Sequence, residues 1–129
     1  MSNRMAFGLL LSLTLVGSPA TAQTASPHYG VWRQDDGSVT VRIAACPQST
    51  AACATVIAER IQPGEPSLLN QTVVRDMIPN GARRWRGRYV VDGQSLNATA
   101  RLLSDDRLTM RVCALAFLCD SIRLERIGR

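Results

Sequence analysis

The side chains that could support catalysis are few, and their spacing argues against an enzyme. Two pairs of adjacent carboxylates, Asp35-Asp36 and Asp105-Asp106, could act as a general acid and base. Each pair lies at a turn signal, and adjacent residues on a strand point to opposite faces, so turn formation explains them better. The only histidine, His28, lies in the polar tail before the first expected strand, where a general-base role is not expected. We therefore expect no catalytic residues and no enzymatic activity.

The four cysteines could bind a metal or form disulfides. They occur as two close pairs, Cys46 with Cys53 and Cys113 with Cys119, and neither spacing is the C-x-x-C of a zinc site. This spacing favours two local disulfides, 46–53 and 113–119, as found in small exported domains. Long-range pairings such as 46–113 or 53–119 are the alternative. We expect no metal and no cofactor.

The N-terminus has the composition of an export signal. Arg4 precedes an apolar run over residues 6–16, and Ala20-Thr21-Ala22 fits a cleavage site. The run is shorter than the roughly 20 apolar residues that span a bilayer. We expect a cleaved signal peptide over residues 1–22 and a single domain over residues 23–129. This places the protein in the periplasm or outside a bacterial cell, with no stable membrane insertion after cleavage.

Positive charge comes entirely from arginine. The formal net charge of +5 falls to +4 when Arg4 leaves with the signal peptide, and it favours anionic partners. Export argues against nucleic acid as that partner. Arg84, Arg86 and Arg88 alternate along one expected strand. We interpret them as a solvated outer face, with an anion-binding face for lipid headgroups, cell-wall polymer or an acidic protein as the alternative.

After the signal, apolar residues repeat every two positions, which is the period of β-strands. Turn residues such as Asp92-Gly93 and Pro79-Asn80-Gly81 separate the strands. The expected strands begin at Gly30 and continue over residues 39–45, 53–61, 70–77, 84–91, 96–102, 108–112 and 122–124. A short helix within residues 63–70 is possible. This pattern predicts an all-β, antiparallel up-and-down barrel of about seven or eight strands with disulfide-tied loops.

Strand alternation makes a specific prediction about Arg126. Counting along the last strand from Ile122 and Leu124 places Arg126 on the inward face. An arginine buried without a partner is costly, and the face of a tryptophan is one possible partner. Trp32 in the first strand is the candidate, because a closed barrel brings the first and last strands together.

Three features follow one another along the chain: an early Gly-x-Trp, an alternating strand that leads to two cysteines, and a Trp-x-Gly before the central hairpin. They are Gly30-x-Trp32, residues 39–43 followed by Cys46 and Cys53, and Trp85-x-Gly87. In this order they resemble the bacterial domain of unknown function 2147, a family of small exported proteins. The resemblance implies a lipocalin-like barrel. It also implies that Gly30, Trp32 and Arg126 form a structural clasp at one end.

The expected barrel suggests two functions. A barrel of about eight strands is either filled by its own side chains or holds one small ligand. The leading hypothesis is an exported module that binds a small apolar or amphipathic ligand, and the alternative is a periplasmic protein-interaction module such as a protease or lysozyme inhibitor that binds an envelope protein. The inward side chains expected to line the ligand site are Trp85, Tyr89 and Met110, together with Leu96, Val112 and Leu124.

The segment between the last two cysteines, residues 114–118, is apolar throughout. It includes Leu115, Phe117 and Leu118. We expect this loop to fold over the barrel mouth and close the core. The alternative is an exposed contact site for a partner or a membrane.

Overall fold

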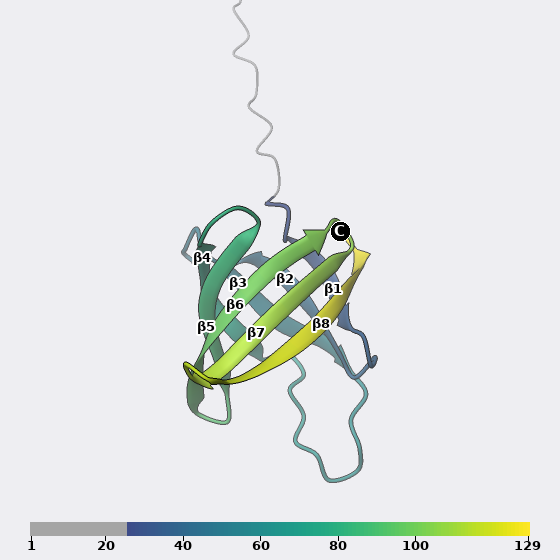
Figure 1. Cartoon of the computed structure of the whole chain (residues 1–129). Coiled ribbons are helices and arrows are strands. Elements are labelled where there is room, and N and C mark those ends of the chain that lie inside the picture. Colours follow the sequence, from purple (N-terminus) through teal and green to yellow (C-terminus); the bar gives the residue numbers. More distant parts are fainter. Residues whose placement is uncertain (1–25) are drawn as a thin grey trace, which may run out of the picture.

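The computed structural model describes residues 26–129, which form eight antiparallel strands closed into a barrel (Figure 1). Each strand pairs with the next along the chain, and β1 closes the barrel against β8. The strands are β1 (Gly30–Gln34), β2 (Val39–Ala45), β3 (Ala52–Glu59), β4 (Thr72–Pro79), β5 (Arg84–Val91), β6 (Gln94–Ser104), β7 (Arg107–Leu115) and β8 (Leu118–Gly128). The predicted all-β, up-and-down barrel is confirmed. The predicted signal peptide, residues 1–22, lies outside the described residues.

The barrel has two different ends. We call the end where β1 begins the closed end; it also holds the C-terminus and is uppermost in Figure 1. We call the opposite end the open end. Four connections lie there: residues 35–38, 60–71, 92–93 and 116–117. The longest of these, between β3 and β4, hangs below the barrel in Figure 1.

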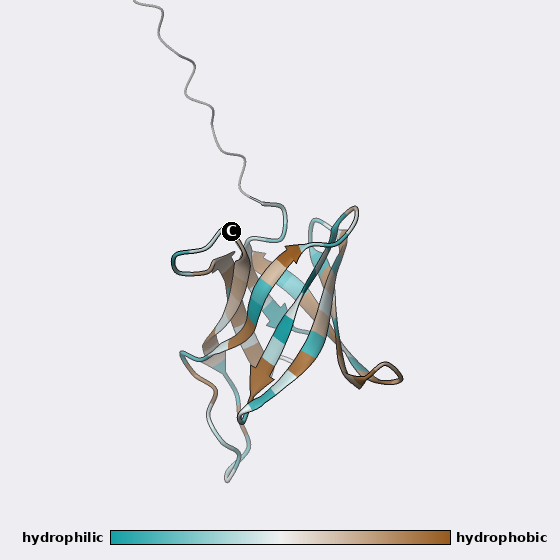
Figure 2. Ribbon diagram, turned by 90° about the vertical axis from the view of Figure 1, so that its left-hand side faces the viewer, coloured by the Kyte–Doolittle hydropathy of each residue, from teal (hydrophilic) through white to brown (hydrophobic). Residues whose placement is uncertain are grey.

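Alternating side chains produce the core. Inward positions carry apolar residues and outward positions carry polar ones, so hydrophilic and hydrophobic bands alternate along the strands (Figure 2). Trp32, Ile43, Val56, Met77 and Leu108 are the largest fully buried side chains. They come from five different strands, and the full set of buried apolar side chains includes members of all eight, so burial of apolar surface stabilises the whole barrel.

Both disulfides have the predicted local connectivity. Cys46–Cys53 joins the residue after the end of β2 to the start of β3, with a Cα–Cα distance of 4.9 Å. Cys113–Cys119 crosses from β7 to β8 just before their hairpin, with a Cα–Cα distance of 4.0 Å. Disulfides are typical of proteins in oxidising, extracytoplasmic compartments.

Residues 63–70, where a short helix was one possibility, form no helix. This segment is part of the β3–β4 loop, where Pro63 and Pro66 lack the backbone N–H groups that a helix needs. The Glu59 carboxylate holds the loop instead, by accepting hydrogen bonds from the Ser67 hydroxyl and the Leu68 N–H. Within residues 26–129, no helix is long and apolar enough to cross a membrane.

An irregularity in β4 explains one glycine. The register between β4 and β5 shifts between Arg75 and Ile78, and Asp76 has a positive φ of 57°. The shift brings β4 close to Gly87, where a Cβ atom would lie 2.6 Å from the Arg75 carbonyl oxygen and 2.9 Å from Met77 Cγ. Met77 therefore packs into the space beside this glycine, and Gly87 leaves no room there for a ligand.

Candidate functional site

Arg126 ties the two chain ends together at the closed end. Its guanidinium carbon lies 4.4 Å from the centre of the Trp32 ring. Its three nitrogens donate hydrogen bonds of 2.6 Å to the carbonyl oxygens of Pro27, Tyr29 and Asp105. The charge is thus shared between an aromatic face and three backbone acceptors, which lowers the cost of its partial burial.

Gly30 is required at this clasp. Its φ of +142° is a conformation that side chains rarely adopt. A Cβ atom there would lie 2.5 Å from Arg126 Nη1 and 2.7 Å from the Gly128 carbonyl oxygen. The first strand can approach the last only because this position has no side chain.

His28 packs into the closed end of the barrel, a position that the sequence did not indicate. Its side chain is 4% exposed and stacks on Trp85 with a ring-centroid distance of 3.9 Å. Neither ring nitrogen has a hydrogen-bond partner among the described residues. Burial, together with the charge of Arg126, lowers the pKa of His28 to about 4. The aromatic pair His28-Tyr29, directly before Gly30-x-Trp32, is the signal that could have indicated a capping segment.

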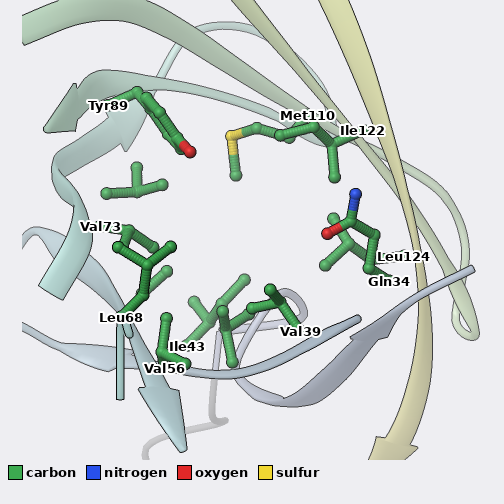
Figure 3. A pocket seen from close by; sticks show the side chains of 13 residues that line it. Gln34, Val39, Ile43, Val56, Leu68, Val73, Tyr89, Met110, Ile122 and Leu124 are labelled. Atoms are coloured by element: carbon green, nitrogen blue, oxygen red, sulfur yellow. The ribbon is translucent and has the colours of Figure 1, made fainter. Parts of the chain in front are cut away.

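A cavity of about 70 Å³ lies inside the barrel toward the open end (Figure 3). Its wall is formed by inward side chains of strands all round the barrel and by Leu68 of the β3–β4 loop. Nearly all of these side chains are apolar. The lining residues are Gln34, Val39, Val41, Ile43, Ala54, Val56, Leu68, Val73, Val74, Tyr89, Met110, Ile122 and Leu124.

Two lining residues carry polar groups into this apolar space. The Tyr89 hydroxyl and the Gln34 amide point toward the cavity from opposite walls (Figure 3). Burial and the nearby Asp92 carboxylate raise the pKa of Tyr89, so its hydroxyl stays protonated at neutral pH. A protonated phenol donates a hydrogen bond, while Asp92 disfavours a negative charge on a ligand atom at the same place.

Three of the six residues expected to line a ligand site line this cavity. Tyr89 and Met110 face the cavity, and Leu124 completes its wall. The expectation for Trp85 is corrected, because this residue lies at the closed end, stacked on His28. Leu96 and Val112 also do not line the cavity.

The apolar hairpin does not cover the barrel mouth. Leu115, Phe117 and Leu118 are 56%, 77% and 56% exposed, so the expectation that this loop closes the core is wrong. The Cys113–Cys119 disulfide holds the two strands together at its base, and the tip projects away from the barrel (Figure 2). The hairpin is therefore available for contacts outside the barrel.

Arg84, Arg86 and Arg88 point outward from β5 and are exposed. Arg88 donates hydrogen bonds to Ser95 and Asn97 on the neighbouring strand β6. These three arginines lie on the outer surface, and the barrel wall separates them from the cavity.

One solved structure supports the assignment of the fold. HP1028 from Helicobacter pylori, described as belonging to the lipocalin family, aligns with this chain with a TM-score of 0.58 at 14% sequence identity. The alignment covers 81% of this chain and 84% of HP1028. The barrel is lipocalin-like. No family model and no curated protein matches the sequence, so the resemblance to the domain of unknown function 2147 stays a prediction.

Proposed function

We propose that this lipocalin-like barrel binds one small apolar or amphipathic molecule in the cavity at its open end. The observation that carries the proposal is the unfilled apolar space between Tyr89 and Gln34. The rest of the interior, which includes Trp32 and Leu108, is filled by the protein's own side chains. Packed protein interiors contain few voids larger than a water molecule, so a cavity of this size at one end supports a binding role.

The size and polarity of the cavity limit the ligand. Its volume of about 70 Å³ is well below the roughly 300–1,000 Å³ of sites that hold drug-sized molecules. It suits a very small apolar molecule or one end of an alkyl chain. Tyr89 and Gln34 provide hydrogen bonds for a single polar group, and Asp92 favours a neutral group over an anionic one. A straight-chain alcohol has this combination of features.

The exported location and the family relationship belong to the same proposal. The two disulfides and the apolar leader support a periplasmic or secreted protein of bacterial origin. The order of Gly30-x-Trp32, the cysteine pair and Trp85-x-Gly87 supports a relationship to the domain of unknown function 2147. A binding role fits a protein whose paired carboxylates, Asp35-Asp36 and Asp105-Asp106, lie in turns.

Calorimetric titration with straight-chain primary alcohols, and with carboxylates of the same chain lengths, tests this proposal. The alcohols should bind in a one-to-one complex and more tightly than the carboxylates. Ile122→Trp, which fills the cavity, should abolish binding, because Ile122 lines it. Ile127→Trp is the matched control, since Ile127 is 47% exposed on the same strand. Absence of alcohol binding to the unaltered protein, or equal binding by both variants, would contradict the proposal.

A further inference from the structure

The outer surface of β5–β8 is unusually rich in arginine. Three rows of outward residues cross these four strands in register: Arg84, Arg101, Thr109 and Arg123; Arg86, Thr99, Arg111 and Ser121; Arg88, Asn97, Cys113 and Cys119. We call these twelve positions the arginine face. Six of them are arginine and none is acidic. The rest of the chain holds nine arginines and ten acidic residues, so the net positive charge of the chain is concentrated on this face.

The arginines of this face have few partners within the protein. All six are exposed. Arg88 donates hydrogen bonds to Ser95 and Asn97. The other five make no side-chain hydrogen bond or ion pair within residues 26–129. The two ion pairs within residues 26–129 are made by other arginines, Arg83 and Arg107, which lie at the edge of the arginine face toward the closed end. Five uncompensated guanidinium groups close together attract anions more strongly than single surface charges do.

The apolar hairpin continues this same face. The third row ends in the Cys113–Cys119 disulfide, and Leu115, Phe117 and Leu118 follow directly beyond it. Figure 2, in which the outer surface of β6–β8 is at the right, shows the hairpin projecting to that side rather than over the mouth. Phe117 at its tip is 77% exposed. The disulfide fixes this apolar tip beside the arginine face.

We propose that the arginine face and the apolar hairpin together form a docking surface for an anionic lipid membrane. The arginines would contact lipid phosphates, and Leu115, Phe117 and Leu118 would enter the boundary between headgroups and acyl chains. A basic face with an adjacent apolar element is the combination that binds such interfaces. A soluble anionic polymer would satisfy the arginines but leave Phe117 in water. Asp92 and Asp120 near the open end favour contact through the side of the barrel rather than through its mouth.

This inference goes beyond the ligand proposed for the cavity and does not depend on it. Co-sedimentation with phosphatidylcholine vesicles, with and without phosphatidylglycerol, tests it on the mature chain. Binding should require the anionic lipid. Replacing Arg86 and Arg111 with glutamine should weaken binding about 25-fold, at about fivefold for each arginine near an anionic surface. Replacing Arg42 and Arg60 with glutamine removes the same charge away from the arginine face and should have much less effect.

The hairpin is tested separately. Phe117→Ser should weaken vesicle binding by about tenfold, the cost of leaving one aromatic side chain unburied. Leu69→Ser, at a residue that is 45% exposed in the β3–β4 loop, is the control and should change little. Phe117→Trp should show fluorescence quenched by brominated acyl chains, which only insertion of the tip produces.

Three outcomes would overturn the inference. One is equal loss of binding in the two double-arginine variants, which would indicate a general charge effect. Another is binding to anionic vesicles without quenching of Phe117→Trp. The third is binding to dextran sulfate but not to anionic vesicles, which would assign the arginine face to a polymer. Circular dichroism of each variant separates these results from misfolding.

Discussion

Acidification should destabilise this barrel through His28, the only histidine of the chain. The imidazole is buried beside Arg126, and neither of its nitrogens has a hydrogen-bond partner among residues 26–129, so the folded state favours the neutral ring. Its pKa falls from 6.5 to about 4 on folding. The unfolded chain therefore binds the proton more readily, and stability is lost as the pH falls from 6.5 toward 4. This loss is about 2 kcal/mol between pH 7 and 5, and about 3 kcal/mol by pH 4.

His28→Phe isolates this effect. Phenylalanine keeps the stacking on Trp85 and removes the unpaired nitrogens, so the variant should be at least as stable as the unaltered protein at neutral pH. Urea unfolding followed by tryptophan fluorescence gives the free energy of unfolding of both proteins across this pH range. The gap in stability should widen in favour of His28→Phe as the pH falls.

The other titrating groups do not obscure the result. Hydrogen bonds from Ser38 lower the pKa of Asp36, and those from Ser67 and Leu68 lower the pKa of Glu59. Protonation of these carboxylates also destabilises the folded protein as the pH falls. It does so equally in the unaltered protein and in His28→Phe, so it cancels in the difference between their free energies of unfolding. A gap that stays constant from neutral pH to pH 4 would refute the burial of a neutral His28.

Three further changes test the closed end and the hairpin. Gly30→Ala should cost about 1–3 kcal/mol of unfolding free energy, because the new Cβ meets Arg126 and the Gly128 carbonyl oxygen; an unchanged urea midpoint would contradict this. Arg126→Met should cost about 2 kcal/mol or more, since three carbonyl oxygens lose a charged donor, and a stabilised variant in thermal unfolding would count against the clasp. Replacing Cys113 and Cys119 with serine should cost about 2–3 kcal/mol while the circular dichroism spectrum stays that of a β-barrel; loss of that spectrum would show that the bridge is needed for folding.

Strand alternation accounts for how much of this fold could be predicted. The two-residue period identifies which side chains face inward, and it therefore placed Arg126 on the side where it meets Trp32. The short spacing of each cysteine pair similarly favoured the local bridges that the structure has. Both inferences depend only on neighbouring residues.

What the sequence could not indicate is which end of the barrel is packed by its own side chains and the direction in which a loop projects. Trp85 and Tyr89 share one inward face, yet Trp85 packs at the closed end and Tyr89 lines the cavity. Alternation treats them alike, because it says nothing about which end is packed. The β7–β8 hairpin projects outward rather than over the open end. An apolar segment such as residues 114–118 is compatible with either orientation, so its composition could not decide between them. The burial of His28 depends on tertiary contacts with Trp85, which an alternating pattern within strands does not show.

The proposed ligand site lies in the interior of the barrel, near its open end. Nuclear Overhauser effects between a straight-chain alcohol and protein labelled at methionine and isoleucine methyl groups locate the bound molecule. We expect contacts from the alkyl chain to the Met110 methyl and to Ile122, both of which line the cavity. Alkyl contacts confined to the exposed Ile127 methyl, or no contacts at saturating alcohol, would contradict it.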